Sequence, residues 1–219
     1  MTRSLLAAFG ALLMGVTAAP APAEAQAAAW KLIPNYSRAT FKSDAPLETF
    51  VGNTTGAEGI AGEITLDPAK PQTATGQVKV DLTTVRTGIE RRDADMRSKN
   101  YLDTDTPANR WAVFDLKGVE LAGPLEVGKV LPAKLRGVLT VKGKPVDITA
   151  PAQVNYIRLT PEQLESQKRF GFTAENVKVR TTFGTTFVNH GMQVPQLLFL
   201  KVNNEIQLEA DVTFARVAP

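Results

Sequence analysis

His190 is the only histidine of the chain, and its type makes it the first residue to consider for chemistry. It lies in Asn189-His190-Gly191-Met192, which is typical of a loop. A serine–histidine–aspartate triad would have to use His190, but no Gly-x-Ser-x-Gly elbow surrounds any serine. With no cysteine and no second histidine, the sequence lacks a conventional transition-metal ligand set. We therefore predict no catalytic residue and no metal site.

Two pairs of nearby aspartates offer a second kind of chemistry. Asp93 with Asp95, or Asp103 with Asp105, could act as paired carboxylates in glycoside hydrolysis. Asp103 and Asp105 could also contribute oxygen ligands to calcium, but the rest of an EF-hand loop is missing. Neighbouring acidic residues are common in turns, and no glycine-rich phosphate loop follows. The sequence predicts neither an enzyme nor a cofactor.

The segment 82–105 departs from the pattern of the rest of the chain. Ile89 and Met96 are seven residues apart, which places both on one face of a helix. Asp93 precedes Arg97 by four residues, as acidic and basic residues do on exposed helices. A short helix with one apolar edge, set between strands, indicates a lid or plug on a sheet.

Most of the other segments alternate between apolar and polar residues, which is typical of half-buried strands. Thr160-Pro161-Glu162-Gln163 interrupts them as the start of a short helix that ends by Gly171. About eight to ten strands without a helix after each favour an antiparallel barrel or sandwich in one domain. The predicted strands are 30–42, 47–51, 60–66, 77–83, 114–121, 134–142, 146–154, 170–179, and a hairpin of 197–202 with 206–214.

Composition limits the partners. The 219 residues contain 25 Lys and Arg against 22 Asp and Glu, a net charge of +3. That excess is too small for a nucleic-acid-binding face, so we predict no nucleic-acid partner.

The N-terminus predicts export. Arg3 precedes an apolar run from Leu5 to Ala19, and small residues follow around Ala25 and Ala27. These are the parts of a secretory signal peptide, and the apolar run is shorter than a membrane-spanning helix requires. We predict a signal peptide over residues 1–27, one β-domain over 28–219, and a periplasmic or secreted location.

The inward positions of the predicted barrel are small or medium in size, including Gly62, Val78, Gly137, Ala150 and Ala210. A barrel of about eight strands can either be filled by side chains or hold one ligand. Two interpretations follow: an apolar slot for a ligand, or tight closure of a small-residue core.

Two segments resemble the YceI-like family of periplasmic, lipocalin-like polyisoprenoid-binding proteins. The first runs from Asp81 through Leu82-Thr83-Thr84-Val85-Arg86-Thr87-Gly88-Ile89 to Thr104, and the second is Gly137 to Val146. Trp30, Ser37 to Phe41 and the closing segment Val202 to Phe214 extend the resemblance over about residues 29 to 216. Tyr36 stands where the family usually has histidine, so the chain resembles a divergent branch.

The resemblance implies an extended antiparallel barrel that holds an isoprenoid or other long-chain lipid without catalysis. By analogy, the predicted lipid-binding wall residues are Phe41, Phe50, Ile64, Phe114, Leu139, Ile148, Phe172, Phe199 and Phe214. Bidentate guanidinium groups suit phosphate, so the predicted head-group residues are Arg86, Arg91, Arg92 and Arg97. For each set the alternative is structural: core packing for the wall and a solvated helix face for the arginines.

Two further alternatives stay open. A ligand-free structural or interaction module of the cell envelope would have the same strand pattern with a filled interior. An exposed edge strand, such as Trp30 to Lys42, would allow pairing across a homodimer.

Overall fold

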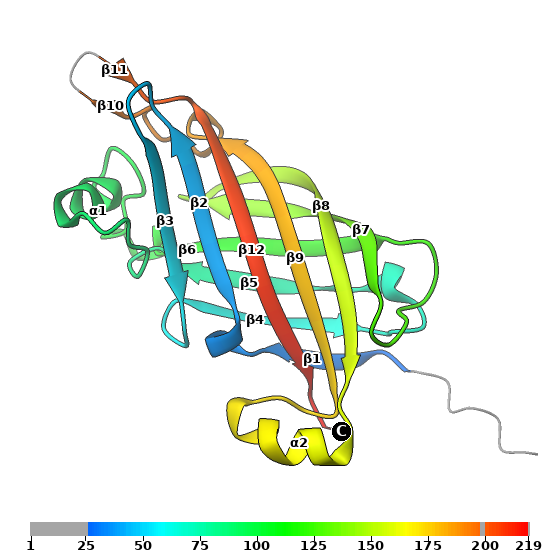
Figure 1. Ribbon diagram of the computed structural model, residues 1–219. Coiled ribbons are helices and arrows are strands. Elements are labelled where there is room, and N and C mark those ends of the chain that lie inside the picture. The colour runs from blue at the N-terminus through cyan, green and yellow to red at the C-terminus, as the bar shows by residue number, and fades with distance from the viewer. Residues whose placement is uncertain (1–25, 198–199, 219) are drawn as a thin grey trace, which may run out of the picture.

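The computed structural model describes residues 26–197 and 200–218, and it is an antiparallel β-barrel (Figure 1). The two α-helices of this part of the chain are α1 (Glu90–Arg97) and α2 (Pro161–Gln167). The strands are β1 (Ala28–Leu32), β2 (Arg38–Asp44), β3 (Thr49–Thr55), β4 (Ile60–Leu66), β5 (Thr75–Asp81), β6 (Trp111–Glu120), β7 (Val130–Val141), β8 (Lys144–Arg158), β9 (Glu175–Thr186), β10 (Gln196–Leu197), β11 (Leu200–Lys201) and β12 (Glu205–Arg216).

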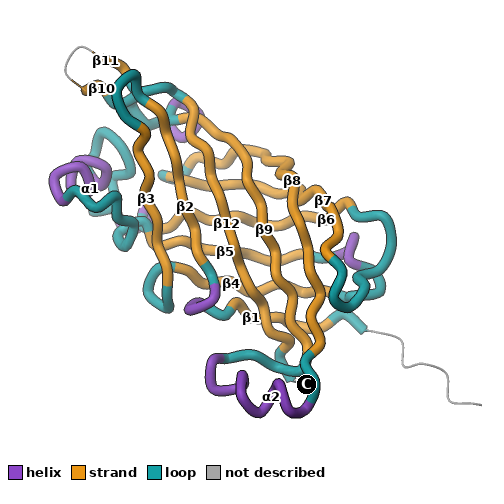
Figure 2. Tube along the Cα trace, in the orientation of Figure 1, coloured by secondary structure: helices purple, strands orange, loops and turns teal. Residues whose placement is uncertain are grey.

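Eight strands close into a ring in the order β1, β4, β5, β6, β7, β8, β9 and β12, and β12 pairs back to β1. The closing pair aligns Trp30 with Arg216 and Leu32 with Phe214. Strands β2 and β3 extend the sheet from the other end of β12. Figure 2 shows the result as two crossing layers, with β4, β5 and β6 behind β2, β12 and β9. The predicted all-β fold, a single antiparallel barrel of about eight strands with one or two short helices, is confirmed.

The predicted single strand 30–42 is two strands. The chain turns through a 3-10 helix that begins at Pro34, because proline lacks the amide donor that a continuous ladder needs. The Ser37 hydroxyl donates to Ile33 O and accepts from the Thr213 amide, so β12 bridges the break. Since β1 pairs with β4 and β12, and β2 with β12 and β3, this segment is not an edge. The edge strand of the ten-stranded sheet is β3.

The predicted C-terminal hairpin is also wrong. Strand β12 pairs with β9 through eleven residue pairs, from Glu205 opposite Thr186 to Ala215 opposite Asn176. The short strand β11 pairs instead with β10 in a separate two-stranded sheet. The apolar run 197–202 therefore does not continue into the barrel, although its composition is typical of a strand.

The two helices differ in how well the sequence signals them. Helix α2 begins with the predicted capping box, in which Thr160 and Gln163 exchange side-chain and backbone hydrogen bonds. Helix α1 begins only after Ile89, whose side chain is 48% exposed, so the predicted apolar face with Met96 does not form. Met96 alone packs against the core. Figure 1 shows α1 beside β3, outside the ring of strands. No helix in the described ranges is long and apolar enough to cross a membrane.

Trp30 and Tyr156 form a buried aromatic pair in the core. Trp30 is fully buried, and its indole donates to Leu66 O over 3.0 Å. Tyr156 meets it edge to face, with ring centroids 6.3 Å apart. The Tyr156 hydroxyl donates to the Glu175 carboxylate, which also accepts hydrogen bonds from Arg158 and Arg216. The ion pairs of Glu175 with Arg158 and Arg216, together with its hydrogen bond from Tyr156, therefore hold the Tyr156 ring in place against Trp30.

Glu175 is predicted to stabilise the fold against acid. Burial alone would raise its pKa, but the hydrogen bonds from Tyr156, Arg216 and Arg158 outweigh burial and lower the pKa from 4.5 to about 2. A lowered carboxyl pKa stabilises the folded state above the unfolded value, and this contribution is lost as the pH falls from 4.5 to about 2. Urea unfolding of Glu175→Gln at neutral pH should show a loss of about 2 to 3 kcal/mol. Across that acidic range the stability of the variant should vary less than that of the wild type; parallel pH profiles would contradict this role.

Candidate functional site

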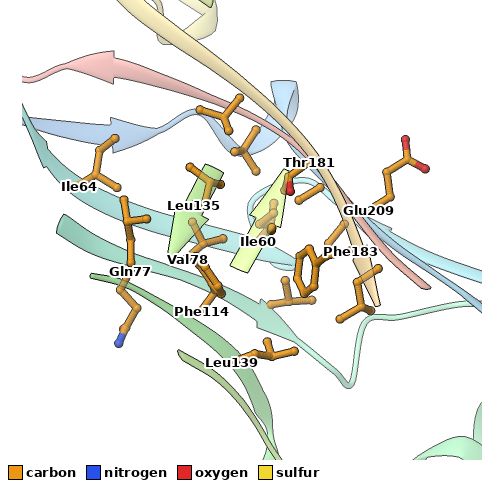
Figure 3. Close-up of a pocket in the computed structure, with 18 of the residues that line it drawn as sticks. Ile60, Ile64, Gln77, Val78, Phe114, Leu135, Leu139, Thr181, Phe183 and Glu209 are labelled. Atoms are coloured by element: carbon orange, nitrogen blue, oxygen red, sulfur yellow. The ribbon is translucent and has the colours of Figure 1, made fainter. Parts of the chain in front are cut away.

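A cavity of about 210 Å³ lies between the two layers of the barrel (Figure 3). Its wall is built by β2 to β9 and β12, with contributions from the connections that hold Pro71, Val85 and Leu125. Nearly all of the lining side chains are aliphatic or aromatic. The cavity exists because the facing side chains of two crossing sheets, including Ala112 and Ala210, are too small to meet in the middle.

The four polar residues that border the cavity are Thr40, Gln77, Thr181 and Glu209. The Thr181 hydroxyl donates to Pro151 O over 2.8 Å, and the Gln77 amide donates to the Asp115 carboxylate over 2.7 Å. Figure 3 shows the polar groups of Gln77 and Glu209 directed away from the cavity. Thr40 pairs with Glu209, and the neighbouring pair is Phe41 with Leu208. Because side chains alternate along a strand and Phe41 and Leu208 point inward, Thr40 and Glu209 point outward. A ligand in the cavity would therefore make apolar contacts.

The structure brings five of the nine predicted wall residues to this cavity: Phe41, Ile64, Phe114, Leu139 and Phe214. Three others lie elsewhere. Ile148 is buried in the core without lining the cavity. The rings of Phe50 and Phe172 contact Arg92 and Tyr36 instead. Phe199 lies outside the described residues. A role in lipid binding stays a prediction for all nine.

Phe50 and Phe172 lie away from the cavity for two different reasons. Phe172 was assigned to a strand starting near residue 170, but β9 begins at Glu175 and Phe172 precedes it in a connection. Its ring centroid lies 4.6 Å from that of Tyr36. Phe50 shares the alternation of Gly52, which does line the cavity, but lies nearer the end of β3. There the Arg92 guanidinium covers it, 4.5 Å from the ring centroid.

Several residues that line the cavity were not predicted from the sequence. Phe183 continues the alternation of Val177 and Val179, so extending that strand by four residues would have found it. Leu125 and Pro71 come from connections, and no periodicity marks them as inward. Val85 lies in the segment that was interpreted as leading into a helix.

The four arginines that were predicted to bind a head group lie in different environments. Arg86 and Arg97 both donate to Val85 O, the carbonyl of a residue whose side chain lines the cavity. The Arg97 Nε atom is buried and has no hydrogen-bond partner among the described residues. Arg92 pairs with Glu48 across the gap between α1 and β3, and Arg91 is exposed. Two of the four thus hydrogen-bond the backbone of a cavity-lining residue, although no arginine side chain is itself part of the lining.

Two of the four candidate aspartates, Asp93 and Asp103, have structural partners. Asp93 is buried and accepts hydrogen bonds from both the amide and the hydroxyl of Thr87. Burial would raise the pKa of Asp93, but these bonds, with the nearby Arg97 and Arg86 charges, lower it below its usual value. Asp103 accepts from Thr106 and Asn109 in the following turn. In residues 26–197 and 200–218 no three acidic or histidine side chains gather as a metal site would require.

His190 is fully buried, with one ring nitrogen 2.8 Å from the Thr185 hydroxyl and the other 3.2 Å from Lys144 O. Burial lowers its pKa, against the opposing effect of the hydrogen bond to Lys144 O. These contacts join the start of β8 to the end of β9. The arrangement holds the barrel wall together and does not present the imidazole to the cavity.

The comparison with solved structures shows the same fold in three bacterial proteins. BcnA of Burkholderia cenocepacia matches at 16% identity over 81% of this chain and 95% of its own, with a TM-score of 0.61. A polyisoprenoid-binding domain from Saccharophagus degradans matches at 16% identity over 87% and 99%, with a TM-score of 0.63. The YceI protein of Campylobacter jejuni matches at 16% identity over 77% and 85%, with a TM-score of 0.56. The comparison with curated proteins found no match.

The family comparison covers almost the whole described chain. The model of the YceI-like domain matches residues 30–214, from the buried Trp30 in β1 to the lining Phe214 in β12. This range contains six strands of the ring in full and most of β1 and β12, together with the cavity-lining residues and the segment that carries Arg86 and Arg97. The chain therefore belongs to the YceI-like family.

Proposed function

We propose that this protein binds the apolar chain of an isoprenoid or similar amphiphilic lipid inside its barrel and performs no catalysis. The observation that carries the proposal is the cavity, whose polar border residues have their polar groups bonded or directed elsewhere. Burying hydrocarbon in such a space stabilises the complex by roughly 25 cal/mol per Å² removed from water. The polyisoprenoid-binding domain with the same fold supports this assignment.

The size of the cavity indicates how much of a chain it can hold. An apolar cavity of about 150 Å³ accepts a benzene-sized molecule, so a volume of about 210 Å³ corresponds to about one to two isoprene units. A longer chain would need the side chains around the cavity to move or its remainder to leave the barrel. The junction of β3 with the segment that follows β5 is a place where this could happen, because its backbone pairing is one isolated bridge, Asn53 to Arg86, beside a hydrogen bond between the Thr54 and Thr84 hydroxyls.

The same place suits an anionic head group. Gly52 and Val85 line the cavity on the two sides of this bridge, and Arg86 and Arg97 surround the Val85 carbonyl. The buried, unpartnered Nε of Arg97 is a donor that a phosphate oxygen could accept from. We place the head group here, with Arg86 and Arg97 as its ligands.

Export and self-association complete the proposal. The signal-peptide pattern of residues 1–27, most of which lie outside the described residues, supports a periplasmic or secreted protein. Strand β3 pairs with β2 on one side and, in the part of the chain that is described, forms only the Asn53 bridge on the other. An edge of this kind could pair with a second copy. A ligand-free structural module is the alternative function, and the cavity argues against it.

Identifying the lipid that co-purifies with the protein tests the proposal directly. Protein expressed with residues 1–27 intact should be extracted with organic solvent and the extract analysed by mass spectrometry. We expect an isoprenoid or another long-chain amphiphile in stoichiometric amount, and wild-type protein stripped of lipid should bind farnesol. An empty extract together with no farnesol binding would favour the ligand-free module.

Filling the cavity should remove binding without unfolding the protein. Ala210 lines the cavity and is partly accessible from it, so Ala210→Leu places its added carbons in empty space. We expect farnesol affinity to fall about tenfold or more while the melting temperature is kept. Ala215 is the matched control: it lies on the same strand, is 6% exposed and does not line the cavity, so Ala215→Leu should overpack its site and cost about 1 to 3 kcal/mol of stability without blocking the cavity. Unchanged farnesol binding by Ala210→Leu would place the ligand elsewhere.

The head-group assignment makes a separate prediction. Arg97→Gln should weaken binding of farnesyl diphosphate about tenfold, the effect of one charged hydrogen bond, and leave farnesol binding unchanged. Arg91→Gln removes the same charge from an exposed site and serves as the control. Titration of both ligands into both variants gives the comparison, and equal losses in the two variants would refute a specific role for Arg97.

A further inference from the structure

Three aromatic rings form a layer along one side of the cavity. Gly52 lies opposite Phe41, Phe41 opposite Leu208, and Leu208 opposite Phe183, in one row across β3, β2, β12 and β9. From the other sheet, Phe114 meets Phe183 with ring centroids 6.2 Å apart. Figure 3 shows Phe114 and Phe183 projecting into the cavity from different strands. We call Phe41, Phe183 and Phe114 the aromatic layer.

On β2, β9 and β12 the cavity lining ends at this layer. The next inward positions on β2, β9 and β12 are Ser43, Thr185 and Ile206, all buried and none lining the cavity. Ser43 donates to Glu205 O over 3.1 Å, and Thr185 is bonded to the buried His190. Opening this region would break buried hydrogen bonds, which is costly. The rings of the aromatic layer make no hydrogen bonds, so they are the part of the cavity boundary that can move.

Gly52 sets the position of the Phe41 ring. A Cβ atom at Gly52 would lie 2.3 Å from Phe41 Cε1 and 2.9 Å from Cζ, so the ring occupies the space that a side chain would take. The three nearest atoms all belong to this ring, and none is backbone. Gly137, which lies under Phe114, differs because its Cβ would also come within 2.4 Å of Asp115 O. Gly52 is therefore the position where one methyl group moves an aromatic ring without straining the sheet.

We propose that the aromatic layer limits the size of the apolar chain that the cavity accepts, and that Gly52, by letting Phe41 lie flat on β3, sets this limit. The inference rests on the proposed lipid-binding function and names its specificity determinants. Removing the Phe41 ring enlarges the cavity next to Gly52 and Leu208. Adding a methyl group at Gly52 pushes the ring off β3 into space that the ligand would use.

The test compares geraniol, farnesol and geranylgeraniol, which increase by one isoprene unit at each step, in calorimetric titrations of lipid-free protein. Each additional buried methylene strengthens binding about fourfold, so Phe41→Ala should raise the preference for geranylgeraniol over geraniol about tenfold or more. Gly52→Ala should shift the preference about tenfold the other way. Phe41→Leu is the second variant if Phe41→Ala does not fold, with a smaller shift in the same direction.

Phe170→Ala is the matched control, because it removes the same ring from a site that contacts Tyr36 and not the cavity. Its size preference should equal that of the wild type. If the wild type binds none of the three alcohols, the proposed function fails. If the wild type binds them but the Phe41 and Gly52 variants keep the wild-type preference, the size limit is overturned and the lipid-binding function stands.

Discussion

The barrel closes through β12, which pairs with β9 along one edge and with both β1 and β2 along the other. One twelve-residue strand can do this because the break at Pro34 divides the first part of the chain into two shorter strands. Strand β1 then turns towards β4 to complete the ring, while β2 continues with β3 as an extension. The crossing of the two layers, and with it the space between them, follows from this division.

The cavity is a consequence of that crossing and of small side chains at its centre. Alanines such as Ala112 and Ala210 leave a space that larger side chains would fill. Gly137 acts differently from the sequence-based prediction, which counted it among the small inward residues that leave room. Phe114 covers Gly137 and Phe41 covers Gly52, so a glycine on one strand provides the seat for a ring from its neighbour. The rings of Phe41 and Phe114 thus take up space that side chains at these two glycine positions would fill.

Much of the fold was predictable because alternation and turn chemistry are local signals. Lys142 and Gly143 adopt the positive φ angles of a tight turn between β7 and β8, and Thr160 caps α2 as its sequence indicates. The site was only partly predictable. Phe41 and Phe114 lie on regular strands and their inward direction follows from the pattern, whereas Phe172 and Leu125 lie in connections, where no period fixes the direction of a side chain. The run 197–202 was misassigned because apolar composition does not specify a pairing partner.

Isotope-filtered NOE spectroscopy on the complex with farnesol tests most directly whether the barrel interior is the binding site. With labelled protein and unlabelled ligand, we predict contacts between the farnesol chain and the methyl groups of Ala112 and Ala210, together with the rings of Phe114 and Phe183. No contacts should reach exposed apolar residues such as Leu47 and Val188. Contacts confined to those surface residues, or a spectrum unchanged by farnesol, would contradict an open interior that holds an apolar chain.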